Sequence, residues 1–309
     1  MQNILQSISS QLAHGIEKGE GVSLPPYRRI ICAGMGGSSI AGEILSIANP
    51  EVIVHWDYGL PKSATGGDLV ICTSWSGDTE ETVSAWQAAR DMGLDTLVIT
   101  SGGALADMAR EARSPLIELD RMNDSPRMNA IMMASALFAA LGMTDSLPQE
   151  LAEDDMRAQG KELAEAIGDR IPVIYAAYPH RKLTGFWKNV YSETAKRQVM
   201  VNWFPSAAHV EVVGWEGPYQ DILIPVLLRD PVDEDDRYAR NFDALLAILA
   251  KKGYNVPTIQ LSGNTLMEKV FNNYLLALWT SFYAATALGV DPVALTLLNE
   301  FKALKAKAD

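Results

Sequence analysis

Short apolar runs alternate with longer amphipathic segments along this chain, and the alternation restricts the fold more than any other feature. In the first half, short runs rich in Val, Ile and Leu predict strands at positions 28–34, 51–56, 68–74, 95–101 and 114–119. Between most of them lie predicted helices such as "SSIAGEILSIA" and "TEETVSAWQAARDMG". Strands joined by helices pair in parallel through right-handed crossovers, with helices on both faces of the sheet. The first half is therefore predicted to be an α/β domain with a doubly wound parallel sheet.

The same pattern restarts in the second half of the chain, where strands are predicted at 171–177, 197–204, 221–228 and 256–261. A well-buried helix predicted at 127–141 closes the first half, and the polar segment "TDSLPQELAEDD" follows it. A length of 309 residues exceeds what one hydrophobic core usually organises. We predict two α/β domains, each a three-layer αβα sandwich, at residues 1–148 and 149–309.

The formal net charge of −12 restricts the possible partners. Nucleic acids and anionic membranes are bound through clustered Lys and Arg, which this composition disfavours. The sequence also lacks an uninterrupted apolar stretch of about 18 residues, the length that crosses a bilayer. We therefore expect neither a nucleic acid nor a membrane as partner. A small anionic substrate remains compatible, because a local cluster of N–H and hydroxyl donors binds phosphate even in an acidic protein.

The two cysteines, Cys32 and Cys72, each lie inside an apolar run, in no CxxC or metal-ligand spacing. They are predicted to be buried free thiols, which are typical of a reducing compartment. The N-terminal segment "MQNILQSISSQLAHGIEKGEG" has a helical pattern, unlike a signal peptide. The protein is therefore expected to be cytoplasmic. We expect no metal, since no cluster of His and carboxylates has ligand spacing, and no organic cofactor.

The segment "TSWSGDTEET" at 73–82 places several hydroxyls directly after a predicted strand and at the start of a predicted helix. Ser74, Ser76 and Thr79 are expected to point their hydroxyls inward, and Gly77 permits close approach of the backbone. Free N–H groups at the start of the helix add partial positive charge. This combination predicts a phosphate site. The alternative is a simple helix cap, which needs only one of these hydroxyls.

A second loop, "GMGGSS" at 34–39, also lies between a predicted strand and a helix. Its glycines permit a tight turn against a ligand. The loop is not a dinucleotide fingerprint, because position 39 is Ser where the GxGxxG pattern requires Gly. A short loop of Gly and Ser suits the hydroxyls of a sugar.

At these two loops the sequence resembles a known family. "GMGGSSIAGEIL" and "TSWSGDTEET" are similar to the sugar isomerase (SIS) domain, and the resemblance extends across essentially the whole chain to the bifunctional phosphoglucose/phosphomannose isomerases, which have two SIS domains. Four further blocks match in order and spacing: "SPRMNA" at 125–130, "SETAKRQ" at 192–198, "PSAAHVE" at 205–211 and "GVDPVALTLLNEFKAL" at 289–304.

The resemblance implies an aldose–ketose isomerase that interconverts glucose 6-phosphate and fructose 6-phosphate through a cis-enediol, without a cofactor. Whether mannose 6-phosphate is also a substrate is left open. Ring opening and proton transfer between C1 and C2 require a carboxylate, a cation beside the enediolate, and a further acid or base at the ring oxygen. By position in the family pattern, these roles fall to Glu193 as proton shuttle, Arg127 as the cation, His209 in ring opening and Lys302 near the ring oxygen.

The resemblance also assigns the substrate contacts and the assembly. Ser74, Ser76 and Thr79 would hold the phosphate, while Gly36, Gly37 and Ser38 would line the sugar side. A homodimer is implied, in which the histidine reaches the active site of the neighbouring subunit.

Each catalytic assignment has an alternative in the sequence alone. Glu193 could be a solvated helix residue that pairs with Lys196 or Arg197. His209 could be a structural or exposed histidine, and Arg127 a surface arginine in the first turn of a helix that Pro126 begins. The fourth residue, Lys302, lies in "NEFKALKAK", which is also explained as a charged amphipathic helix in which Lys305 and Lys307 are close by.

The sequence departs from the family pattern at several positions. Ala208 and Val210 replace the asparagines that flank the family's histidine, Ser192 replaces an asparagine before the glutamate, and Val293 stands where the family has threonine, with Thr296 as the nearest hydroxyl. Two other functions therefore stay open. One is a non-catalytic sensor of sugar phosphates, although no basic output segment is present. The other is an isomerase of a different phosphosugar.

Overall fold

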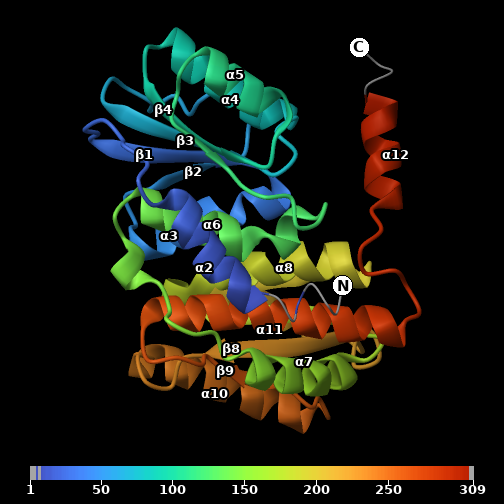
Figure 1. Cartoon of the computed structure of the whole chain (residues 1–309). Coiled ribbons are helices and arrows are strands. Elements are labelled where there is room, and N and C mark those ends of the chain that lie inside the picture. The colour runs from blue at the N-terminus through green and yellow to red at the C-terminus, as the bar shows by residue number, and fades with distance from the viewer. Residues whose placement is uncertain (1–4, 6–7, 306–309) are drawn as a thin grey trace. The chain divides into compact units, whose positions relative to one another are not determined.

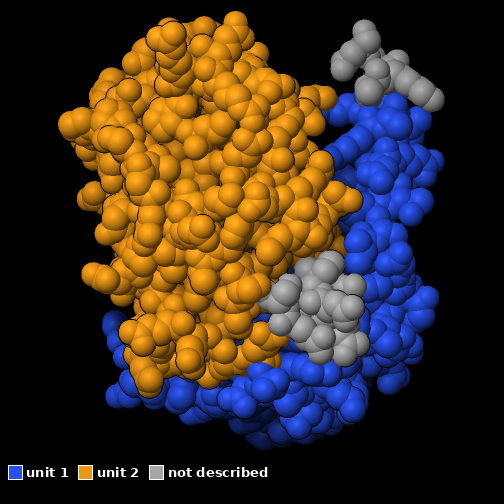
Figure 2. All heavy atoms as spheres, in the orientation of Figure 1, with its two compact units in different colours: residues 1–2, 154–261, 273–309 blue, residues 3–153, 262–272 orange. Residues whose placement is uncertain are grey.

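The computed structural model describes Leu5 and residues 8–305. The chain forms two compact units, which are coloured separately in Figure 2. We call them the N-terminal unit, residues 3–153 with 262–272, and the C-terminal unit, residues 1–2, 154–261 and 273–309. Each unit contains its own parallel sheet. The segment 262–272 groups with the N-terminal unit although it follows the last strand of the other sheet, an arrangement that no signal in the sequence indicates.

The N-terminal sheet has five parallel strands in the order β2-β1-β3-β4-β5. All five are predicted in the sequence, and the edge strands are shorter than expected. The strands are β1 Arg29–Gly34, β2 Ile53–His55, β3 Asp68–Ser74, β4 Asp95–Thr100 and β5 Leu116–Glu118. Every residue of the central strand β3 is buried, in agreement with the apolar run from Leu69 to Cys72 in its middle.

Helices cover both faces of this sheet, as Figure 1 shows. Helices α4 (Glu80–Asp91) and α5 (Gly103–Glu111) cover one face, and there Val70, Cys72 and Val98 pack against residues such as Trp86. The opposite face carries α2 (Ile8–Gly19), α3 (Ile40–Ala48) and α6 (Ala130–Ala140). Alternate strand residues point to opposite faces, so Cys32 meets α3 while its neighbours Ile31 and Ala33 face the other layer. The predicted doubly wound α/β fold is confirmed for this unit.

The helix expected at 127–141 begins later than predicted. Pro126–Met128 forms a 3-10 turn (η2), and α6 starts at Ala130 after Asn129. Pro126 therefore begins a short turn, and the expectation that Arg127 opens the α-helix is wrong. The interpretation of Arg127 as a surface residue is wrong too, because its side chain is fully buried. The expected burial of α6 itself is confirmed, since all its residues from Ala130 to Ala139 are buried.

The C-terminal unit repeats the plan with four parallel strands in the order β7-β6-β8-β9. The strands are β6 Ile171–Ala177, β7 Met200–Phe204, β8 Leu223–Arg229 and β9 Thr258–Gln260. Strand β7 is shorter than the predicted 197–204, because Lys196 ends the preceding helix in a left-handed conformation with φ 58° and the strand begins only at Met200.

Helices again lie on both faces of the C-terminal sheet. Phe242 of α10 and Ala207 of α9 pack on the sheet residues Tyr175, Phe204 and Leu227. The helices of this unit are α7 Glu153–Ile167, α8 Arg181–Ala195, α9 Ser206–Gly214, α10 Asp236–Lys251, α11 Leu266–Ala287 and α12 Thr296–Lys305. Helix α11 starts in the segment that belongs to the N-terminal unit and continues into the C-terminal one.

Both cysteines are buried free thiols, as predicted from their apolar surroundings. Burial raises the pKa of the Cys32 thiol to about 12, so this thiol stays protonated and packs as a small apolar group. Among the helices of the described residues, none has both the length and the hydropathy needed to span a bilayer.

A buried carboxylate fastens the first residue of β3. The Asp68 side chain is inaccessible to solvent and lies 2.7 Å from the Arg29 guanidinium, and it accepts the backbone N–H of Thr65 at 2.9 Å. Burial alone raises the pKa of Asp68, but the hydrogen bonds from Arg29, from Thr65 and from Arg28 outweigh it and lower the pKa below its usual range. The ionised form is thus favoured in the folded state.

We expect Asp68→Asn to lower the free energy of unfolding by about 1–2 kcal/mol at pH 7, because charge-assisted bonds to a buried acceptor are lost. A lowered pKa in the folded state stabilises the protein at pH values above the unfolded value of about 3.9, and this contribution disappears as the pH falls further. The difference between variant and wild type should therefore shrink below about pH 4 in urea titrations. Asp95→Asn, at the exposed start of β4, is the control and should change stability by less than about 0.5 kcal/mol. A constant difference from pH 7 to pH 3 would contradict this role.

Candidate functional site

The predicted phosphate loop lies where β3 ends and α4 begins. The Ser74 hydroxyl, fully buried, donates to Thr79 Oγ1 at 3.0 Å and accepts the backbone N–H of Gly77 at 3.1 Å. Thr79 is the N-cap residue of α4, yet its side chain makes no capping hydrogen bond. The alternative of a simple helix cap is therefore wrong for this threonine. With its oxygen accepting from Ser74, the Thr79 hydroxyl keeps its own proton to donate to a ligand.

Close backbone packing shapes this loop. Gly77 has φ +78°, and a Cβ there would lie 1.8 Å from the carbonyl oxygen of Gly102. A third loop, after β4, thus lies against the phosphate loop, and Leu105 donates its N–H to the Gly77 carbonyl at 3.0 Å. This loop was not predicted, although its signal, "SGG" starting at the last residue of a predicted strand, resembles that of the other two.

The glycine loop after β1 meets both the phosphate loop and the turn that carries Arg127. It forms a 3-10 turn, η1 (Gly36–Ser38), in which Gly36 is exposed while the other two residues are buried. A Cβ on Gly37 would lie 2.5 Å from the backbone N of Arg127, so this glycine permits the two turns to touch. The Ser38 hydroxyl accepts the backbone N–H of Trp75 at 3.0 Å and thereby links the two loops.

Arg127 lies in the turn η2, and its side chain is fully buried. Two asparagines that were not predicted as site residues lie on either side of this turn. Asn123 and Asn129 exchange two side-chain hydrogen bonds of 2.9 Å, and Asn129 also donates to the Ser125 carbonyl at 2.8 Å. A buried guanidinium held in a rigid turn is a fixed positive charge of the kind that stabilises an anionic intermediate.

The structure thus brings seven of the predicted residues together in the N-terminal unit: Gly36, Gly37, Ser38, Ser74, Ser76, Thr79 and Arg127. Among the phosphate-loop hydroxyls, Ser74 is buried, Thr79 half-buried and Ser76 exposed. Ser76 accepts the N–H of Asp78 at 3.2 Å. The arrangement offers hydroxyl donors and a helix N-terminus at one end, and the turn of Arg127 packs on the adjoining glycine loop, which suits a phosphorylated substrate.

The remaining three predicted residues, Glu193, His209 and Lys302, belong to the C-terminal unit and lie on three different helices, α8, α9 and α12. Glu193 is half-buried near the end of α8, where its backbone carbonyl accepts Lys196 Nζ, while Arg197 pairs with Asp169 at 3.3 Å. His209 and Lys302 are exposed. Lys305 is half-buried, and Lys307 lies outside the described residues. That these groups meet the phosphate loop in one active site stays a prediction.

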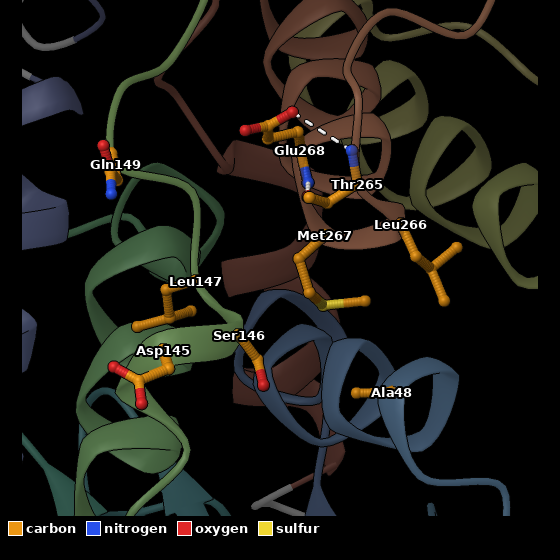
Figure 3. A pocket seen from close by; sticks show the side chains of 9 residues that line it. All are labelled: Ala48, Asp145, Ser146, Leu147, Gln149, Thr265, Leu266, Met267 and Glu268. Carbon is orange, nitrogen blue, oxygen red and sulfur yellow. Dashed lines mark hydrogen bonds between the residues drawn. The ribbon is translucent and has the colours of Figure 1, made fainter.

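A pocket of about 420 Å³ in the N-terminal unit is separate from these residues and lies at the start of α11. Figure 3 shows its lining, which includes Leu147, Met267 and the capping pair of Thr265 and Glu268. Glu268 accepts the N–H of Thr265 at 3.1 Å, and the Thr265 hydroxyl accepts the N–H of Glu268 at 3.2 Å, which is a capping box. The carboxylate of Glu268 is thus explained by helix capping.

Comparison with known proteins identifies the family. The model of the bacterial phospho-glucose isomerase C-terminal SIS domain matches residues 157–304. A bifunctional phosphoglucose/phosphomannose isomerase of Aquifex aeolicus (strain VF5) is 30% identical over 292 residues, which are 90% of this chain and 91% of that protein. The chain belongs to the bifunctional phosphoglucose/phosphomannose isomerase family. The resemblance seen in the sequence is confirmed.

A more distant sequence relative and a solved structure of the same fold also match this member of the isomerase family. A D-glucosamine-6-phosphate 4-epimerase of Sulfolobus acidocaldarius is 23% identical over 67% of this chain and 70% of that protein. The structure of the C-terminal domain of glucosamine-fructose-6-phosphate aminotransferase from Francisella tularensis superposes with a TM-score of 0.66 at 14% identity, over 94% of this chain and 97% of that one. The predicted SIS fold is confirmed by this likeness and by the parallel sheets.

The geometry of the phosphate loop predicts that Thr79→Val weakens the binding of inorganic phosphate about tenfold, because one hydroxyl donor to the anion is lost. Isothermal titration with phosphate measures this directly. Thr82→Val is a matched control on the same helix, since the Thr82 hydroxyl is buried and has no hydrogen-bond partner. Equal phosphate affinity of the two variants would place the anion elsewhere.

Proposed function

We propose that this protein is a cytoplasmic aldose–ketose isomerase that interconverts glucose 6-phosphate and fructose 6-phosphate, and mannose 6-phosphate and fructose 6-phosphate, through a cis-enediol. The observation that carries the proposal is the phosphate loop itself: a buried Ser74, a half-buried Thr79 without a capping bond and a helix N-terminus, in a member of this isomerase family. The loop binds the 6-phosphate, and the opened sugar extends away from it. The proposed reaction uses no cofactor.

In the proposed reaction, different side chains bind the phosphate end and the sugar end of the substrate. Ser74, Ser76 and Thr79 anchor the phosphate, and the glycine loop with Ser38 lines the sugar. The guanidinium of Arg127 stabilises the negative charge that develops on the enediolate oxygens, since it is buried and permanently charged. Because a buried charge interacts strongly with a nearby anion, one arginine makes a large contribution to the transition state.

Proton transfer is assigned to the C-terminal unit. The carboxylate of Glu193 takes the proton from one carbon and returns it to the other, which interconverts aldose and ketose. His209 protonates the ring oxygen and opens the ring, and Lys302 supports the charge at that oxygen. Ala208 and Val210, both exposed, cannot supply the amide contacts that asparagines at these positions would make to the sugar. The preference between the two aldoses therefore depends on other groups.

The exposure of α9 supports a homodimer in which His209 completes the active site of the partner. Most residues of this helix are exposed, and Ala207 is its buried residue. Val210 and Val213 are 76% and 63% exposed, an unusual state for two valines on one helix. Burial of this helix against a second copy of the chain removes both side chains from water and carries the histidine next to Val210 across the interface.

A second candidate is the isomerisation or epimerisation of another phosphosugar, which the similarity to the 4-epimerase of Sulfolobus acidocaldarius favours. A third is a sugar-phosphate sensor, which needs the phosphate loop but no proton shuttle. The candidates separate when each hexose 6-phosphate and amino-sugar phosphate is offered in turn and product is identified.

The proton-shuttle assignment predicts that Glu193→Gln lowers kcat by roughly a hundredfold or more, while fructose 6-phosphate still binds, because the amide keeps the shape but not the basicity of the carboxylate. A coupled assay measures turnover, and calorimetry measures binding. Glu165→Gln, an exposed glutamate on α7, is the control and should keep wild-type rates. If the wild type binds the sugar phosphate without turning it over, the sensor is the correct function.

The shared-site proposal predicts complementation between two inactive variants. In a dimer of one Glu193→Gln subunit and one His209→Ala subunit, one of the two sites has both wild-type groups if the histidine acts across the interface. Such heterodimers, isolated by two different tags, should regain about half of the wild-type rate per dimer. Each variant paired with itself is the control. An inactive heterodimer would show that His209 acts within its own subunit or not at all.

A further inference from the structure

Trp75 lies in the middle of the phosphate loop and is 1% exposed. The simplest explanation for a large buried aromatic side chain at this position is packing in the core. Its polar groups, however, connect three separate segments. The backbone N–H donates to the Ser38 hydroxyl of the glycine loop at 3.0 Å, and the backbone carbonyl accepts both the N–H and the hydroxyl of Ser101, at 3.1 Å and 2.6 Å. The indole Nε1–H donates to the carbonyl of Asn123 at 2.9 Å.

The indole bond begins a chain of contacts that ends at Arg127. The backbone carbonyl of Asn123 accepts the indole hydrogen bond. The side chain of Asn123 forms two hydrogen bonds of 2.9 Å with the side chain of Asn129 and accepts the backbone N–H of Ser125 at 3.0 Å. Asn129 is inaccessible to solvent and holds the Ser125 carbonyl at 2.8 Å. The turn η2 is thus held on both sides of Arg127. On its remaining side the turn rests on the backbone of Gly37.

We propose that Trp75 is a positioning residue that aligns the guanidinium of Arg127 with the bound phosphate. Trp75, a residue of the phosphate loop, thereby sets the distance between the bound phosphate of the substrate and the Arg127 guanidinium, which faces the C1–C2 end of the opened sugar. The inference rests on the proposed function, because it takes Arg127 as the cation beside the enediolate. It differs from a packing role, which any aromatic side chain of similar size would fill.

The test is Trp75→Phe, which keeps an aromatic ring and removes the indole donor. We expect kcat to fall by about ten- to a hundredfold, since a catalytic charge displaced by about 1 Å costs up to this factor. The KM for fructose 6-phosphate and the inhibition constant of inorganic phosphate should stay within about threefold of wild type, because the hydroxyls of the loop are unchanged. Asn129→Ala breaks the same chain at its other end and should show the same separation of kcat from KM.

The chain offers a matched control in Trp86→Phe. Trp86 is a buried tryptophan of the same unit, 6% exposed, whose indole N–H has no hydrogen-bond partner. Both substitutions remove similar volume from the core, so both should lower stability to a similar extent. If the loss of kcat in Trp75→Phe comes from the lost indole hydrogen bond and not from the lost core volume, Trp86→Phe keeps kcat near the wild-type value. A similar loss of kcat in both variants, or a loss in Trp75→Phe that appears equally in KM, would overturn the proposal.

Two further measurements make the result specific to Arg127. In an Arg127→Lys background, Trp75→Phe should change kcat by less than about twofold, because the two residues act as a unit. An undiminished effect there would also overturn the proposal. Hydrogen exchange across residues 123–129 should be faster in Trp75→Phe than in Trp86→Phe. This last measurement needs no turnover, so it tests whether Trp75 holds the turn even if the wild type isomerises no sugar phosphate and the proposed function itself has failed.

Discussion

The N-terminal site depends on the close approach of four backbone segments at the ends of β1, β3 and β4 and in the turn before α6. Ordinary side chains would separate these segments: a Cβ on Gly77 would lie 1.8 Å from Gly102 O, and one on Gly37 would lie 2.5 Å from Arg127 N. Real Cβ atoms do not approach other atoms this closely, so glycine is required at both positions. Because the segments touch, the loop hydroxyls and the turn that carries Arg127 come together from distant parts of the chain.

The two units share a fold and differ in chemistry at the equivalent place. In each sheet the strand order reverses between the first and third strands of the unit, β1 and β3 or β6 and β8, where ligands of such sheets bind. After β3 this place holds hydroxyls and glycines. After β8 it holds the buried carboxylate of Asp230, which lies 3.3 Å from His180 and accepts the N–H groups of Val232 and Asp233 at 3.3 Å. At the end of its central strand the C-terminal unit thus has a buried carboxylate, where the N-terminal unit has the buried hydroxyl of Ser74.

Much of the architecture follows from the sequence because it depends on local patterns. The apolar run inside β3 and the period of α4 are properties of neighbouring residues, and both elements lie where they were predicted. The start of α6 was predicted three residues too early, because the stable local alternative, a 3-10 turn around Pro126, depends on Asn123 and Asn129. The same reason explains why Trp75 was missed, since its partner Asn123 lies 48 residues further along the chain. The placement of Glu193 relative to the phosphate loop is a question of tertiary arrangement that no local pattern addresses.

An acidic protein can bind a dianion because the relevant electrostatics are local. The net charge of −12 is a sum over the whole chain, and at physiological salt charges separated by more than about 8 Å are largely screened. Next to Ser74 lie the Thr79 hydroxyl and the N-terminus of α4, and the turn of Arg127 packs on the adjoining glycine loop. The same segment carries Glu80, Glu81 and Asp78, whose carboxylate accepts the backbone N–H of Ala104 at 3.0 Å. The overall negative charge does not oppose this site but lowers non-specific association with other polyanions. In the proposed site, selectivity for a small sugar phosphate over nucleic acid rests on a few positive dipoles and one buried cation in a chain whose net charge is negative.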